Sequence, residues 1–140
     1  MTHSEDKVSL ARELGADEVV ADGRALANAG GADLVLATSN SNEAMMQAVD
    51  ALRPDGRLVV MGVDGGKPFS FVPVTLLNKR VRILTSSQNH RRDLFEALAY
   101  VAEGKVKVLT ETFALDEIAR AYERVSKGDV RFRAVVLPHG

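Results

Sequence analysis

The sequence contains no cysteine and no tryptophan, and none of its apolar runs approaches the roughly 20 residues of a membrane-spanning helix. Without cysteine, neither a disulfide nor a cysteine-ligated zinc site can form within these residues. The sequence has no excess of positive or negative charge, because it contains 18 Lys and Arg and 19 Asp and Glu. This balance argues against a general nucleic-acid or membrane-surface binder, which would be basic.

The first residues, MTHSEDK, lack the apolar segment of a signal peptide, so we expect a soluble, cytoplasmic protein. The 140 residues, of which 46% are hydrophobic, suffice for about one domain with a core. The three histidines, His3, His90 and His139, show no metal-ligand spacing, and no G-x-S-x-G motif or carboxylate pair is evident. We therefore predict neither a metal site nor a catalytic residue in this chain.

Short apolar runs alternate with amphipathic stretches along the chain. Residues 32–38, 57–63, 82–85 and 133–137 are typical of strands, the first two of strands buried on both faces, and residues 18–21 are a weaker candidate. Residues 4–15, 41–52, 91–103 and 116–127 have helical periodicity. This alternation predicts an α/β fold with a parallel sheet and helices on both of its faces.

Ligands of such sheets bind beyond the carboxyl ends of the strands, which directs attention to residues 2–4, 38–41, 62–66 and 85–89. Small polar side chains at 38–41 suit a ribose or an anion, but they also suit a helix cap. Gly62, Gly65 and Gly66 allow a ligand to approach the backbone, or simply form a turn. Ser4 and Lys7 could hold a phosphate at a helix start, although their spacing alone favours a helix cap beside an exposed lysine.

Five segments together resemble the medium-chain dehydrogenase/reductase superfamily, in particular its zinc-type alcohol dehydrogenases of the cinnamyl-alcohol and bacterial kind. They are SEDKVSLARELGADEVV, ADLVLATS, ALRPDGRLVVMGV, ALDEIARAYERVSKGDV and RFRAVVLP, in the family's order across essentially all of the chain. The resemblance implies an NAD(P)(H)-dependent oxidoreductase that transfers hydride between nicotinamide and an alcohol or aldehyde, with zinc as Lewis acid in the parent enzyme.

The resemblance also implies a division of the chain. Residues 1–90 would be a partial dinucleotide-binding (Rossmann) domain that lacks its first strand and Gly-rich loop. Residues 91–104 would be a connecting helix, and residues 105–140 the C-terminal piece of the catalytic domain. The fold we expect is therefore an incomplete Rossmann-type parallel sheet with flanking helices plus that C-terminal piece.

Cofactor-binding roles carry over by matching position. Thr2, His3, Ser4 and Lys7 match the strand end and helix start that read the adenosine ribose. In the family, the absence of an acidic residue at the turn before Ser4 favours the 2′-phosphate of NADP(H) over NAD(H). Thr38 and Ser39 match the adenosine side, and Gly62 and Val63 the nicotinamide side. The backbone of Ser86 and Ser87 would meet the carboxamide, in a segment that also runs along the family's dimer interface. Arg133 would pair with the pyrophosphate.

The family's G-x-G-x-x-G turn, zinc ligands and proton-relay hydroxyl have no counterpart in this sequence. We therefore expect a C-terminal fragment that is inactive alone and binds no zinc, in which a partner chain, an exchanged element or a rearranged sheet, as in a homo-oligomer, covers the gap. Two alternatives stay open. One is a class I S-adenosylmethionine methyltransferase-like domain, and the other is a non-catalytic interaction or oligomerisation remnant.

Overall fold

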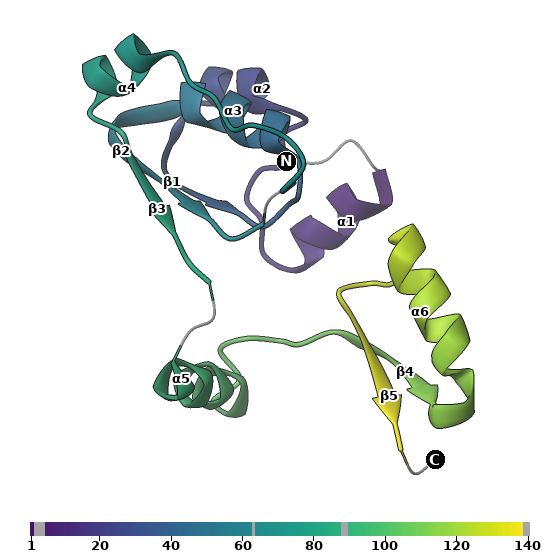
Figure 1. The fold of residues 1–140 in the computed structure, drawn as a ribbon. Coiled ribbons are helices and arrows are strands. Elements are labelled where there is room, and N and C mark those ends of the chain that lie inside the picture. The colour runs from purple at the N-terminus through teal and green to yellow at the C-terminus, as the bar shows by residue number, and fades with distance from the viewer. Residues whose placement is uncertain (2–4, 63, 88–89, 139–140) are drawn as a thin grey trace. The chain divides into compact units, whose positions relative to one another are not determined.

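The computed structural model describes residues 1, 5–62, 64–87 and 90–138. It divides into two compact units, Met1–Gln88 and Asn89–Gly140, each with its own parallel sheet (Figure 1). Among the described residues, no helix is long and apolar enough to cross a membrane.

The first unit alternates helices and strands, as the hydrophobic pattern predicts. In chain order it contains α1 (Glu5–Glu13), α2 (Gly23–Asn28), β1 (Ala32–Ala37), α3 (Asn42–Asp50), β2 (Leu52–Val60), α4 (Pro73–Lys79) and β3 (Arg82–Thr85). The strands form one parallel sheet in the order β1-β2-β3. The α/β class with parallel strands and flanking helices, predicted from the sequence, is confirmed.

The pairing of β1 with β2 contains an irregularity at Arg53-Pro54-Asp55-Gly56, a sequence whose proline and glycine are typical of a turn. Ala32 pairs with Leu52 and Leu34 with Arg57, so β2 inserts extra residues at the Arg-Pro-Asp-Gly stretch. Asp55 takes a left-handed conformation there, with φ of 63°. The turn chemistry is thus realised as a bulge inside β2 rather than as a loop before it.

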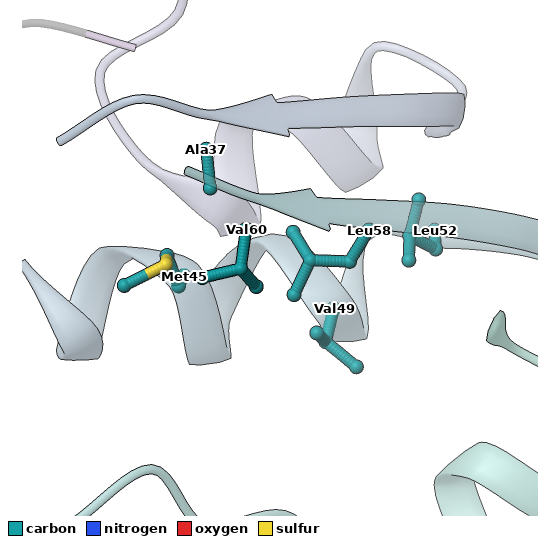
Figure 2. Packing of buried hydrophobic residues seen from close by; sticks show 6 residues of the cluster. All are labelled: Ala37, Met45, Val49, Leu52, Leu58 and Val60. Carbon is teal, nitrogen blue, oxygen red and sulfur yellow. The ribbon is translucent and has the colours of Figure 1, made fainter. Parts of the chain in front are cut away.

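The core of the first unit lies between one face of this sheet and its helices. The apolar face of α3 packs on β2 (Figure 2), and α4 with the preceding apolar segment extends the contact. Its buried members are Ala37, Met45, Val49, Leu52, Leu58 and Val60, with Phe69, Phe71 and Leu76 partly buried against them. Full burial of a valine, leucine or methionine side chain contributes roughly 1.5–3 kcal/mol to stability.

The opposite face of the sheet differs from the sequence prediction. Burial of β1 on both faces is wrong, because Leu34 and Leu36 are 52% and 57% exposed, and Leu84 of β3 is 47% exposed. The physical reason is the pleat: alternate side chains point to opposite faces, and the helices that form the core lie on the other one.

Two local predictions in the first unit also differ from the structure. Residues 18–21 form no strand, and residues 73–79, which are not among the predicted helices, form helix α4. Pro73 stands at the first turn of α4, where its fixed φ and missing N–H suit a helix start.

The second unit contains α5 (Arg91–Ala102), β4 (Thr110–Ala114), a 3₁₀ turn (Leu115–Glu117), α6 (Ile118–Lys127) and β5 (Arg133–Leu137). β4 and β5 are parallel, with α6 as the crossover between them. Phe113 and Ala121 are its buried apolar residues. The predicted end of α6 is confirmed, because Gly128 caps it in the left-handed conformation.

Candidate functional site

The carboxyl ends of the three strands in the first unit lie at one edge of the sheet. Ala37 pairs with Val60, which pairs with Thr85. The amide of Ser86 donates to the carbonyl of Val60 at 3.1 Å, continuing the ladder past the end of β3. The residues that follow each strand are therefore neighbours, and this carboxyl edge is where a parallel sheet binds its ligand.

Thr38, Ser39 and Gly62 meet at this edge through their backbones. The amides of Met61 and Gly62 both donate to the carbonyl of Ala37, at 2.9 and 3.0 Å. A Cβ on Gly62 would lie 2.4 Å from the carbonyl oxygen of Ser39 and 2.7 Å from that of Thr38, which real Cβ atoms do not tolerate. Glycine is thus required at 62 for the segments after β1 and β2 to approach each other.

The segment after β1 is ordered by its own hydroxyls. Ser39 Oγ accepts from the amide of Ser41 at 2.9 Å, and Ser41 Oγ accepts from the amide of Ala44 at 3.2 Å. Ser41 is therefore the N-cap of α3, one of the small polar residues 38–41 that suit a helix cap. Thr38 and Ser39 themselves are exposed.

Asn42, which the sequence analysis did not single out, ties the loop after β2 to the start of α3. Its side chain is buried, and its Nδ2 donates to the carbonyls of Asp64 and Lys67 at 3.1 and 3.0 Å. Its Oδ1 accepts from the amide of Asp64 at 3.1 Å. The signal available in the sequence is weak, since an asparagine beside a helix cap is ordinary.

The other residues with predicted cofactor roles have simple surroundings. Ser86 is half-buried, and Ser87 and Lys7 are exposed. Arg133 belongs to the second unit, where it begins β5 with an exposed side chain. Thr2, His3, Ser4 and Val63 lie outside the described residues. Their predicted roles, like those of the residues at the carboxyl edge, stay predictions.

The basic residues at the end of α4 make structural contacts. Lys79 Nζ donates to the carbonyls of Asp50 and Leu52, at 2.6 and 2.9 Å, and so binds the end of α3. Arg80 forms a two-pronged ion pair with Asp55 of the bulge, with Nε to Oδ1 at 2.8 Å and Nη2 to Oδ2. These contacts lie at the amino-terminal half of β2, away from the carboxyl edge.

The carboxylates with shifted pKa values in the described residues are paired structural groups. The hydrogen bond from Arg80 lowers the pKa of Asp55. In the second unit, the backbone amide of Ala114 and then the guanidinium of Arg120 lower the pKa of Glu117. A lowered pKa keeps both groups ionised at neutral pH, which suits ion pairing rather than proton transfer.

The residues that the structure describes do not fit a zinc site. Cysteine is absent from the sequence, and within the described ranges no three His, Asp or Glu side chains are grouped closely enough to hold a metal ion. The chemistry that the chain does offer at the carboxyl edge is small hydroxyls, backbone amides and a close-packed glycine. These groups suit the sugar, amide and phosphate parts of a nucleotide.

Comparison with known proteins gives consistent matches. The sequence profile of a family described as "Zinc-binding dehydrogenase" matches residues 1–103. An alcohol dehydrogenase of Geobacillus stearothermophilus is 34% identical over 142 aligned positions, covering 94% of this chain, and one of Rhizobium meliloti (strain 1021) is 36% identical over 142, covering 96%. The chain spans 41% of the length of each of these relatives.

Similarity of structure agrees with similarity of sequence. The crystal structure of the alcohol dehydrogenase from Aeropyrum pernix superposes with a TM-score of 0.82 at 29% identity. The match covers 96% of this chain and 41% of that one.

Proposed function

The chain belongs to the zinc-binding dehydrogenase family, and from this premise we propose that it is the C-terminal, cofactor-domain portion of an NADP(H)-dependent zinc-type alcohol dehydrogenase. The observation that carries the proposal is the carboxyl edge of the β1-β2-β3 sheet, where Gly62 lies against Thr38 and Ser39. In an open parallel sheet this edge binds the nucleotide. The first unit then supplies part of a Rossmann domain, α5 connects, and the remainder returns to the catalytic domain.

Each part of the dinucleotide is assigned to residues of this chain. Thr38 and Ser39 would contact the adenosine, and Gly62 with Val63 would lie beside the nicotinamide. Ser86 and Ser87 would meet the carboxamide through their backbone. Arg133 would pair with the pyrophosphate, a bidentate task that suits a guanidinium. When bound, the nicotinamide supplies the hydride chemistry, and the chain's contribution is orientation.

Preference for NADP(H) over NAD(H) rests on the helix start near the N-terminus. Thr2, His3, Ser4 and Lys7 would read the ribose, and the turn at Thr2 and His3, just before Ser4, carries no carboxylate to accept a hydrogen bond from a 2′-hydroxyl. The test is titration of the chain with 2′-phospho-ADP-ribose and with ADP-ribose under identical salt. Tighter binding of the phosphorylated ligand supports the proposal, whereas equal affinities remove the argument for NADP(H).

Catalysis by this chain alone is not part of the proposal. The parent reaction is hydride transfer between nicotinamide and an alcohol or aldehyde. This sequence has no G-x-G-x-x-G turn, and its described part contains no group of His, Asp and Glu side chains that could hold a metal ion. We therefore expect weak nucleotide binding and no alcohol-dependent reduction of NADP⁺. Measurable turnover by the purified chain would contradict this expectation.

We further propose that the chain forms a homo-oligomer and is located in the cytoplasm. The exposed apolar face of the sheet, with Leu34, Leu36 and Leu84, would favour association. Sedimentation of the purified chain should give a mass above 15.1 kDa. A well-folded monomer would argue against a partner chain covering this face.

A further inference from the structure

Asn42 joins two segments that are distant in sequence but adjacent at the carboxyl edge. It is the first residue of α3, immediately after the segment that follows β1, and its bonds reach residues 22 and 25 positions along the chain. Asn42 is 7% exposed, and among the described residues it is the one polar residue that is buried. Its amide is engaged on both sides, with two donated bonds and one accepted bond.

The loop that Asn42 holds is closed on itself. Asp64 Oδ1 accepts from the amide of Gly66 at 3.1 Å, and the amide of Lys67 donates to the carbonyl of Asp64 at 3.2 Å. Lys67 Nζ also pairs with Asp64 Oδ2 at 3.2 Å. These contacts hold residues 64–67 together as a turn, and the three hydrogen bonds of Asn42 attach this turn to the start of α3.

We infer that Asn42 is a positioning residue for the nucleotide site: it sets the spacing between the segment after β1 and the loop after β2, and thereby the affinity for the dinucleotide. The inference rests on the proposed function, because it concerns the same edge. Gly62 already brings the two segments into backbone contact. Asn42 holds Asp64 and Lys67, which follow Gly62 in the loop after β2. A buried amide must satisfy its donors and its acceptor together, so these bonds fix the position of the loop relative to α3.

The first experiment follows the loop without any ligand. In Asn42→Ala the amide of Asp64 loses its acceptor, so its hydrogen exchange should become about tenfold faster, as expected for loss of roughly 1.4 kcal/mol of protection. In Asn42→Asp the acceptor is kept but the two donors are lost, so the amide of Asp64 stays protected while the carbonyls of Asp64 and Lys67 are released. Gln47→Glu, which adds the same negative charge to the exposed side of α3, should leave the loop unchanged.

The second experiment measures affinity for NADP⁺ and NAD⁺ by titration well below the thermal midpoint, where every variant that folds is fully folded. Both Asn42 variants should bind about tenfold more weakly than wild type, and Gln47→Glu should match wild type. A merely structural role would lower the midpoint without changing affinity. In wild type, the side-chain amide resonances of Asn42 should shift on titration, and this readout needs no variant to fold.

The outcomes separate the inference from the proposed function. Binding by wild type with unchanged affinity in both Asn42 variants, or with unshifted Asn42 amide resonances, would overturn the inference and leave the nucleotide site standing. Absence of binding of either dinucleotide to wild type at millimolar concentration would overturn the proposed nucleotide site itself, even if exchange shows the loop held as described.

Discussion

Gly62 lies against Ser39 with no room for a side chain, since a Cβ at 62 would stand 2.4 Å from the Ser39 carbonyl oxygen. The contact joins the ends of β1 and β2, and these two strand ends form the centre of the proposed nucleotide site. A side chain at position 62 would therefore force the backbone segments after β1 and β2 apart.

Gly62→Ala should destabilise the first unit by about 1–3 kcal/mol, the usual cost of forcing extra atoms into a packed region. Gly65 provides the matched control, because a Cβ there would meet nothing within 4 Å. Gly65→Ala should change stability by less than about 0.5 kcal/mol. Urea unfolding of the two variants measures both effects, and equal midpoints would contradict the steric account.

The ion pair between Asp55 and Arg80 should make stability depend on acid pH. Arg80 lowers the pKa of Asp55 below its ordinary 3.8 in the folded protein. The contribution is therefore complete above the ordinary pKa and is lost as pH falls through the lower, folded value. Asp55→Asn keeps a residue that tolerates the left-handed conformation observed at 55 but removes the charge.

The measurement is the free energy of unfolding of wild type and Asp55→Asn across the acid range. Wild type should be the more stable at neutral pH, and the difference should shrink as pH falls below about 4. A difference that is constant with pH would mean that the charge of Asp55 contributes nothing. Because the pair is exposed, high salt should also reduce the difference.

Leu58 is 0% exposed at the centre of the core, whereas Leu77 of α4 is 74% exposed. Leu58→Ala should cost about 2–5 kcal/mol, from lost burial and the cavity left behind. Leu77→Ala removes the same atoms and should cost less than about 0.5 kcal/mol. Thermal or urea unfolding compares them. Similar losses at both positions would mean that the apolar surface of α4 is covered in solution.

Lys7 should affect a phosphorylated ligand more than an unphosphorylated one. Lys7→Gln is expected to weaken 2′-phospho-ADP-ribose binding by about two- to fivefold, the range of an exposed charge pair, and to leave ADP-ribose binding unchanged. Lys107→Gln removes the same charge from an exposed position of the second unit and is the control. An equal effect of Lys7→Gln on both ligands would point to general electrostatics.

Much of the fold was predictable from local pattern. The apolar run of β1, the periodicity of α3 and α5, and the left-handed Gly128 at the end of α6 each depend on residues close together in sequence. Helix α4 was missed, because a short helix with an apolar sequence and a proline at its start resembles a buried loop or strand. The family resemblance was likewise predictable, because it rests on short motifs in a defined order.

By itself, the sequence determined the parallel α/β class, the candidate strand ends and the family. Only the tertiary structure decided which side of the sheet became the core, leaving Leu34 and Leu36 exposed, and which strand ends touch. The close approach at Gly62 and the bonds of Asn42 link residues more than 20 positions apart. Local propensity does not encode such contacts, because they depend on how the strands pair and on which polar groups that pairing buries.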